Sequence, residues 1–530
     1  MKNHLIIYFL IFPFFPMVVN AQYIPLDNRY YDLLYEHYEA KNQSFLSAMK
    51  PLLIQEIDSA VNIQDVLYGK GTAKHRNSFF YRKLFTESLI RYNSGIVKIS
   101  ADPVFHFGLG RETDNGRTSW VNTRGITING LLGNIFSFNT ELYENQAVYA
   151  SWTDSLIRAL QVIPGQGTYK FFGEKGYDFA YSNGYLSCHP SKYFSVSLGY
   201  GKNFIGDGYR SMILSDVAFS YPYLKLTGNL KRIKYTVLYT QLVGRNAIQR
   251  PEFGYERKWA TMHYLQVLLW KRLNVGLFDA VVWENADTSG YRGFDVQYLN
   301  PVVLLRPLEF SIGSPDNALM GMTFNLRVNS HFNLYGQMLL DEFKLSHIIK
   351  NDGWWGNKFG YQIGISGWNL ADIPSLNARV EYNQARPYTY SHSVPIQSYS
   401  HFNQSLAHPL GANFRELIVI TSFSRGNWLA NIKMNFAMYG ADTAGKDFGR
   451  NILIPYTQHV SELNNSIGQG LKTNLNTTDA CFSYMLNRRT NLRIEAGIIV
   501  RNENNDQFSK QAVLFYGGIR TGLRNLYNDF

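Results

Sequence analysis

The strongest constraint in this sequence is an alternation of apolar and polar residues that starts near residue 96. Phe194, Val196, Leu198 and Tyr200 alternate with serines and glycines, and the pattern returns at 376–383, 428–436 and 492–500. A period of two is the side-chain period of a β-strand. The polar face carries charged residues, which a packed core would not bury without partners. We therefore expect strands with one apolar face and one face toward a wet lumen.

The connections between these strands alternate in length. Outer-membrane barrels show this pattern, because their periplasmic turns are short and their extracellular loops are long. We predict an all-β fold, a transmembrane antiparallel β-barrel of about eighteen strands over residues 94–530, with both chain ends on the periplasmic side. The expected short turns lie near residues 133, 190, 231, 271, 330, 373, 426 and 488, and the expected long segments are 111–118, 145–176, 201–213, 244–258, 284–318, 344–357, 384–412, 440–477 and 502–510.

The composition fits a wall exposed to lipid. The chain holds 37 Tyr, 35 Phe, 9 Trp and 43 Gly, but only 17% of its residues are charged. Aromatic enrichment is typical of the interfacial girdles of such barrels. Beyond the N-terminal leader, no stretch supplies the roughly 18 consecutive apolar residues of a transmembrane helix, so a helical membrane protein is excluded. A final Phe530 resembles the assembly signal on the last strand of bacterial barrels.

The first 93 residues differ from the rest of the chain. A short basic head, an apolar run from Leu5 to Val19 and small residues before Gln22 predict a secretory signal peptide over residues 1–21. Export of this kind places a barrel in the outer membrane of a Gram-negative cell. Residues 22–93 show helical spacing, first around Tyr31 and again from Leu52 to Val61. We expect short helices that plug the periplasmic mouth of the barrel or lie against it.

The net charge of +11 indicates acidic partners. For an exported protein these would be lipopolysaccharide phosphates or acidic polysaccharide rather than nucleic acid. Alternatively, many of the cations only solvate turns. Cys188 and Cys481 could pair in an oxidising compartment or remain free. No metal-binding or cofactor-binding motif is present.

The unusual residues of the sequence gather in the long segments and beside them. Aromatic rings stack on the CH faces of sugars, while Asn, Asp and Arg hydrogen-bond to hydroxyls and carboxylates. We therefore expect a polysaccharide site at one end of the barrel, with Trp354 and Trp355 as its best candidates. The full set of candidate ligand-binding residues is Lys202, Asp207, Arg210, Arg306, Glu309, Asp316, Asn317, Trp354, Trp355, Asn357, Arg386, His401 and Arg415.

Several of these residues have other readings. The two tryptophans could belong to a membrane-interface girdle. Arg306, Glu309 and Asp316 could form ion pairs that hold inward-folded loops. An enzyme is not expected, because the sequence lacks a Gly-x-Ser-x-Gly elbow, a His-Glu-x-x-His helix and a Walker loop. The nearby histidines and serines of 391–408 would allow a Ser-His hydrolase, but such residues are common in loops without catalysis.

The segment 197–226 resembles the Wzi-type capsule assembly family. The resemblance rests on Gly201, the turn Asp207-Gly208 and the runs 214–218 and 222–224. It extends more loosely from about residue 96 to residue 530. Within the family the chain is similar to the Bacteroidetes branch that includes the gliding-motility protein RemB. The shared motifs of that branch are 300–301, 306–310, 313–318, 341–343, 353–358 and 399–402.

The resemblance implies a non-enzymatic outer-membrane protein that binds or organises extracellular or capsular polysaccharide, with a possible link to gliding. The family's Trp-rich stretch before Leu214 is replaced here by Asn203-Phe204-Ile205-Gly206, so the identity of the ligand does not carry over. Two alternatives stay open from the sequence. One is a substrate-selective porin, and the other is an adhesion or motility component that binds other envelope proteins.

Overall fold

The fold was analysed in a computed structural model of the chain. It describes residues 22–41, 45–54, 57, 63–68, 78–133, 135–244, 254–287, 290–302, 315–443, 445–522 and 524–530. The predicted signal peptide, residues 1–21, lies outside the described residues. No helix among the described residues is long and apolar enough to cross a membrane.

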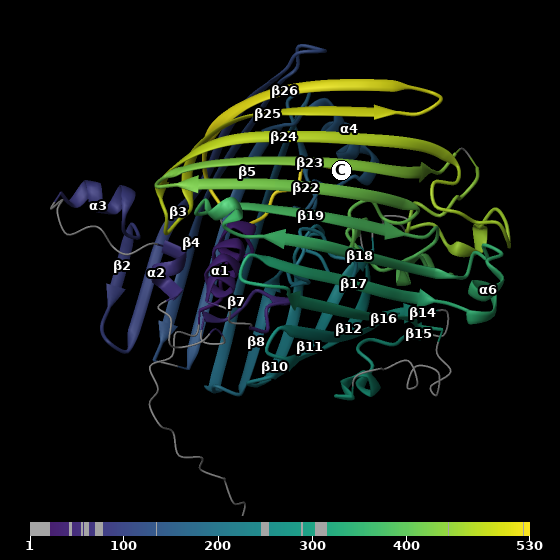
Figure 1. Cartoon of the computed structure of the whole chain (residues 1–530), viewed down its shortest axis with the longest axis horizontal. Helices are drawn as coiled ribbons and strands as arrows, with labels where there is room; N and C mark the ends of the chain where they lie inside the picture. Colours follow the sequence, from purple (N-terminus) through teal and green to yellow (C-terminus); the bar gives the residue numbers. More distant parts are fainter. Residues whose placement is uncertain are drawn as a thin grey trace, which may run out of the picture.

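The chain folds into a closed antiparallel barrel of eighteen strands, as predicted (Figure 1). Neighbours in the wall follow chain order, and β26 pairs with β3 to close the sheet. The wall strands are β3 (Val97–Glu112), β4 (Thr118–Leu132), β5 (Phe136–Val148), β7 (Gly176–Ser191), β8 (Phe194–Gly201), β10 (Tyr221–Leu230), β11 (Ile233–Gly244), β12 (Glu256–Trp270), β13 (Leu273–Glu284), β16 (Asn317–Arg327), β17 (Phe332–Glu342), β18 (Lys358–Gly367), β19 (Leu376–Ala385), β22 (Phe414–Arg425), β23 (Trp428–Ala441), β24 (Leu471–Asn487), β25 (Leu492–Asn504) and β26 (Ser509–Thr521).

Short helices and strands accompany the wall. They are α1 (Asn28–Ala40), β1 (Met49–Lys50), α2 (Ile63–Tyr68), α3 (Phe79–Phe85), β2 (Ile90–Asn93), α4 (Ser151–Leu160), β6 (Lys170–Phe172), β9 (Phe204–Ile205), β14 (Ala286–Asp287), β15 (Gly290–Tyr291), η3 (Val296–Leu299), α6 (Leu345–Lys350), η4 (Leu370–Asp372), η5 (Pro395–Gln397), β20 (Ser400–His401), β21 (Gln404–Ser405) and η6 (Tyr456–Gln458). Short turns and long connections fall at opposite ends of the barrel, here called the short-turn end and the long-loop end.

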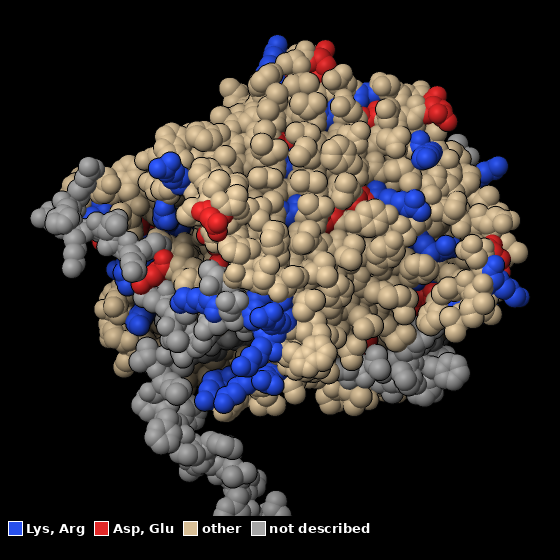
Figure 2. Space-filling view, in the orientation of Figure 1, with Lys and Arg blue, Asp and Glu red and all other residues tan. Residues whose placement is uncertain are grey.

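The outer face of the wall is apolar, as the alternation predicts. Ile432, Phe436, Phe482, Ile494 and Phe515 are each about half exposed on successive strands β23–β26. Figure 2 shows this side of the molecule with mostly uncharged side chains across its middle. A band of this kind suits contact with lipid.

Helix α1 lies inside the barrel at the short-turn end (Figure 1). Its apolar side, which includes Tyr30 and Leu34, is fully buried, whereas its polar side faces β19. Asp32 pairs with Arg379 at 3.1 Å, and Glu36 accepts hydrogen bonds from the turn before β19. Short helices are therefore present within residues 22–93 as α1–α3, although one of the expected helices is not among them and the division into domains remains a prediction.

One expected helix, around residues 52–61, is replaced by extended chain in its described part. Met49 and Lys50 form β1, which pairs with β9, and Leu53 bridges Tyr23. Leu52 and Leu53 are buried by these long-range contacts. Their apolar spacing reflects packing inside the barrel and not one face of a helix.

The loop 202–220, between β8 and β10, corrects a prediction. We expected it to project outward, but residues 203–220 are buried inside the barrel. Its strand β9 pairs with β1, and its Met212 carbonyl accepts a hydrogen bond from Tyr390 of another inward-folded loop, 386–413. Buried side chains of both loops share one apolar core with the inner face of the wall. The lumen is thus largely filled, and the inward-facing charges meet partners rather than bulk water.

The end of the chain also folds inward. Strand β26 stops at Thr521, and residues 524–530 lie inside the barrel instead of continuing the wall to Phe530 as predicted. Strand β26 pairs with residues 106–112 of β3, and β2 pairs with residues 98–101 of the same strand. The expectation of a terminal strand failed because Asp529 finds buried cationic partners in the lumen.

Those partners form a buried ionic network around Arg210. The Arg210 guanidinium lies 3.2 Å from Glu416 and 3.1 Å from Asp529, and all three side chains are at most 1% exposed. His408 contacts Glu416 at 2.6 Å, and Lys433 contacts Asp529 at 3.1 Å. The network joins the inner loop, β22, β23, the loop 386–413 and the chain end.

Candidate functional site

Four of the predicted site residues come together at the long-loop end, where the loops 343–357, 386–413 and 442–470 meet. The centre of this group is Trp355. Its ring stacks on His459, with centroids 4.4 Å apart and planes at 18°, and lies 5.0 Å from the ring of Tyr456. Its Nε1 donates to Glu462 at 2.9 Å. Trp355 therefore joins two loops, and its ring remains partly exposed.

Trp354 forms a second ring stack beside the first. It lies 4.7 Å from His347 with planes at 21°, and the Lys344 ammonium lies 4.7 Å from its ring centroid. His347 also contacts Asp352 at 2.6 Å, and this hydrogen bond lowers the pKa of Asp352. Both tryptophans thus pack within the loops. We name Trp354, Trp355, His347, Tyr456 and His459 the outer aromatic cluster.

Arg386 and Asn357 hold the cluster in place. The Arg386 guanidinium donates to the carbonyls of Asn357 at 2.7 Å, Trp354 at 3.2 Å and Asn465 at 3.4 Å. Asn357 accepts a hydrogen bond from the Lys344 backbone at 2.8 Å. Both side chains position the loops, and most of their hydrogen-bonding capacity is already used there.

A carboxyl pair lies below the cluster in loop 442–470. Burial, and then the nearby Asp442, raise the pKa of Asp447 to about 7. The Asp447 carbonyl accepts a hydrogen bond from Tyr388 at 2.9 Å, and Asp442 accepts from the backbone of Phe448 and Asn451. This loop also supplies His459 and Tyr456, and Asp447 forms a backbone bridge with His459. We therefore expect the protonation of Asp447 to affect the order of the cluster.

Raising the pH from 5 to 8 is expected to loosen loop 442–470. The folded pKa of Asp447 lies above its ordinary value near 3.9, so the folded state binds more protons between these two pH values. The stabilisation is complete below pH ~4 and is lost as the pH rises through ~7. Amide hydrogen exchange of the loop checks this. Asp447→Asn should flatten the pH dependence, whereas Asp506→Asn, an exposed carboxylate of another loop, should leave it intact.

The structure places Lys202, Asp207 and Arg210 inside the barrel. Lys202 donates to the carbonyls of Gly165 and Asp216, both at 2.9 Å. Asp207 accepts from Tyr35 and Ser47, both at 2.6 Å, and Arg210 belongs to the buried ionic network. The sequence could not indicate this, because a polar Gly-rich loop has the same composition whether it folds inward or outward.

Three further candidates are paired and buried near loops. Asp316 binds Arg292 through two hydrogen bonds, at 2.7 and 2.9 Å, which supports its alternative reading as an ion pair that holds a loop. Asn317 donates to the Gln397 carbonyl at 2.9 Å. His401 contacts the Val243 amide at 3.0 Å and the Ser220 carbonyl at 3.1 Å. These residues hold loops together.

Arg415 is separate from the cluster. Arg415 is exposed near the long-loop end of β22, on the same side of the strand as Leu417, which is 38% exposed. It therefore faces the surroundings of the barrel, at the level expected for lipid headgroups. Arg306 and Glu309 lie outside the described residues. Cys188 and Cys481 are both free thiols.

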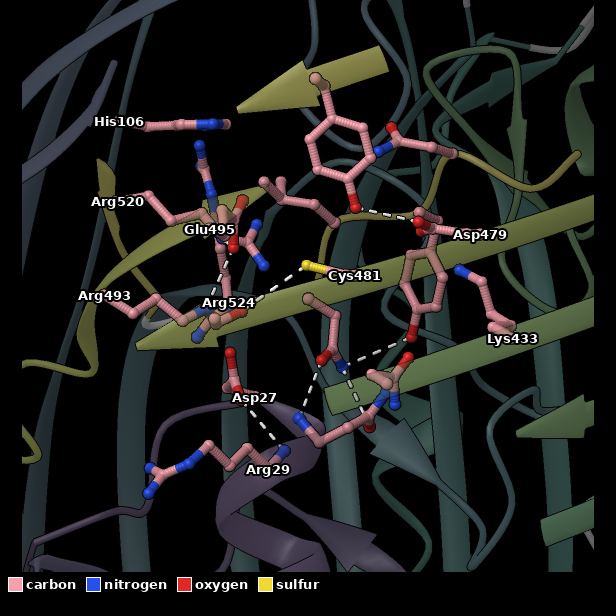
Figure 3. A pocket seen from close by; sticks show the side chains of 18 of the residues that line it. Asp27, Arg29, His106, Lys433, Asp479, Cys481, Arg493, Glu495, Arg520 and Arg524 are labelled. Carbon is pink, nitrogen blue, oxygen red and sulfur yellow. Dashed lines mark hydrogen bonds and ion pairs between the residues drawn. The ribbon is translucent and has the colours of Figure 1, made fainter. Parts of the chain in front are cut away.

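The sequence did not predict a cavity of about 520 Å³ inside the barrel. It lies between α1, the chain end and the inner faces of β3 and β23–β26 (Figure 3). Arg493, Glu495, Arg520, Lys433 and Asp479 line it, together with the free Cys481. The charged residues on the inner faces of 428–436 and 492–500 indicated a polar lumen. Strand periodicity alone could not show which part of the lumen stays empty.

A closed barrel with an apolar outer wall, short turns at one end and long loops at the other is an outer-membrane β-barrel. No family model matches the sequence, and no curated protein matches it. Among solved structures, the chain is similar to Wzi of Escherichia coli, described as a carbohydrate-binding β-barrel involved in group 1 capsule assembly. The TM-score is 0.56 at 14% identity, with 95% of this chain and 100% of that chain covered.

Other similar structures are OprD of Pseudomonas aeruginosa, at TM-score 0.43 and 10% identity over 80% of this chain and 94% of that one, and OccAB2 of Acinetobacter baumannii, at 0.43 and 8% over 80% and 97%. At 14% identity, the similarity to Wzi establishes the fold alone.

Proposed function

We propose that this protein binds or organises polysaccharide at the cell surface through its long-loop end. The observation that carries the proposal is the outer aromatic cluster. It brings together two tryptophans, a tyrosine and two histidines from the two loops 343–357 and 442–470, beside Lys344, Asp352 and Glu462. Aromatic edges and faces suit sugar CH groups, and flanking charges suit hydroxyls and carboxylates.

The filled lumen supports a binding role over free diffusion. Two inward loops, α1 and the chain end occupy the barrel interior. The two loops and Phe530 pack in one apolar core that includes Met212, Tyr390 and Leu406, and α1 packs in a second one. The Wzi barrel, which is similar in fold, is described as carbohydrate-binding. The proposal includes a role in capsule assembly, a role in gliding and binding to other envelope proteins. In an outer membrane the long loops face the outside.

Retention of surface glycan by intact cells tests the proposal. Cells that carry the wild-type barrel should hold more extracellular polysaccharide than cells without it. Joint replacement of Trp354, Trp355 and Arg386 by Ala should lower retention toward the level of the deletion strain. Unchanged retention, at equal amounts of folded barrel in the membrane, would refute this site.

The second candidate function is a substrate-selective porin, and the lumen cavity favours it. A space of about 520 Å³ with charged walls could form part of a permeation path. Conductance in planar bilayers separates the two functions. The binding role predicts no steady current from the wild-type barrel, because buried loops fill the lumen. Steady ionic current would favour the porin.

A further inference from the structure

The lumen cavity has two chemically distinct ends. Toward the long-loop end it is lined by Ala150, Trp152, Ile499 and Leu514, which pack together with Tyr516. At the other end Arg493 and Arg520 lie opposite each other on neighbouring strands, and both donate to Glu495, at 3.1 and 3.0 Å. The cavity therefore has an aromatic and aliphatic surface at one end and several guanidinium groups at the other.

The charged end has an excess of positive charge. Figure 3 shows Asp27 between Arg29 and the group formed by Arg493, Glu495 and Arg520, with Arg524 close by. Arg493, Arg520 and Arg524 thus lie near the carboxylates of Glu495 and Asp27, whereas the Arg29 guanidinium points away from them. Over the whole lining, eight Lys and Arg stand against six Asp and Glu, an excess of two positive charges. Arg29 and Arg524 form no ion pair within 4.0 Å with a described carboxylate.

Polar groups that line the cavity are left without partners. Arg29 Nη1 and Trp152 Nε1 are buried, and neither has a hydrogen-bond partner among the described residues. Such groups are costly unless a ligand or water satisfies them. The space is reachable, because the lining residues Asn431 and Asn528 are exposed and the lining extends to Gly426 and Arg488 in two turns of the short-turn end.

We propose that this cavity is a second binding site, for a small sugar acid that carries one or two carboxylates, such as a hexuronate. Its volume falls in the range of small-molecule sites. Guanidinium groups bind carboxylates in planar, paired geometry, and the Trp152 and Tyr516 rings suit the CH face of a sugar. The site lies in the lumen, away from the outer aromatic cluster, and does not depend on the function proposed for that cluster.

Cys481 supplies the readout, because its free thiol lines the cavity. In full-length barrel with Cys188→Ser, the rate of Cys481 alkylation is measured with glucuronate, glucose or inorganic phosphate present. Glucuronate should protect the thiol, and the two other probes should not. Arg520→Gln should weaken protection by about tenfold or more, the effect of losing one charged hydrogen bond. In this variant Glu495 still forms its ion pair with Arg493, so the carboxylate does not lose all of its cationic partners.

Arg425→Gln is the matched control, since Arg425 is exposed at the last position of β22, at the same barrel end, and lies outside the cavity. It should leave protection by glucuronate unchanged. The thermal midpoint of each variant shows that the barrel is folded. Absence of protection by glucuronate, equal protection by glucose or phosphate, or full protection in folded Arg520→Gln would each overturn the proposal.

Discussion

Replacement of Arg210 by Met is expected to lower the free energy of unfolding by about 3–5 kcal/mol, the cost of breaking a buried ion pair. Glu416 and Asp529 both lose their shared cation, and both are at most 1% exposed. His408 and Lys433 can compensate only in part, because each contacts a single one of these carboxylates. Denaturant unfolding of the detergent-solubilised barrel measures the change.

Arg415→Met is the control for this prediction. Arg415 lies one residue before Glu416 on β22, but its side chain is exposed on the outer side of the wall. Its loss should change the unfolding free energy by less than about 0.5 kcal/mol, as for most surface substitutions. Equal stabilities of the two variants would show that the Arg210 network contributes little, and that the inward loop is held by apolar packing alone.

Replacement of Trp355 by Ala is expected to weaken polysaccharide binding by about tenfold or more, roughly 1.4 kcal/mol. The variant loses a large aromatic surface and the stack on His459, and it leaves Glu462 without its indole donor. Loops 343–357 and 442–470 then lose one of their main contacts. Titration of the purified barrel with polysaccharide from its own cells measures the effect.

Two variants separate ring contact from loop order. Trp355→Phe keeps a ring that can stack but loses the hydrogen bond to Glu462, so it should retain most of the affinity. Trp428→Ala removes a tryptophan that is 52% exposed at the short-turn end and should bind as the wild type does. If Trp355→Ala also binds like the wild type, the outer aromatic cluster serves only to pack the loops.

The wall of the barrel could be predicted because a period of two and the spacing of turns are local properties of the sequence. From these properties we could predict the number of strands, which end of the barrel has the short turns, and which face of each strand points outward. The filling of the lumen was missed, because inward folding depends on contacts between residues far apart in the chain. Asp529 and Arg210, for example, are separated by more than three hundred residues, yet they form one ion pair.

The candidate site shows the same division. Trp354, Trp355, Asn357 and Arg386 were expected at one end, and they do lie together there. Composition could not show that Arg386 is occupied by three carbonyl groups or that Arg210 is enclosed. His459 and Tyr456 were not singled out, although they complete the cluster, because nothing local in 442–470 indicates that it meets 343–357. The cavity could not be predicted from the sequence, because the empty volume depends on how distant segments pack inside the barrel.

The most direct measurement is amide hydrogen exchange of the purified barrel with and without its own cell-surface polysaccharide. Binding at the long-loop end predicts slower exchange in loops 343–357 and 442–470, with the turns of the short-turn end unchanged. No change in those two loops at saturating polysaccharide, or protection confined to the short-turn end, would contradict a polysaccharide site at the outer aromatic cluster.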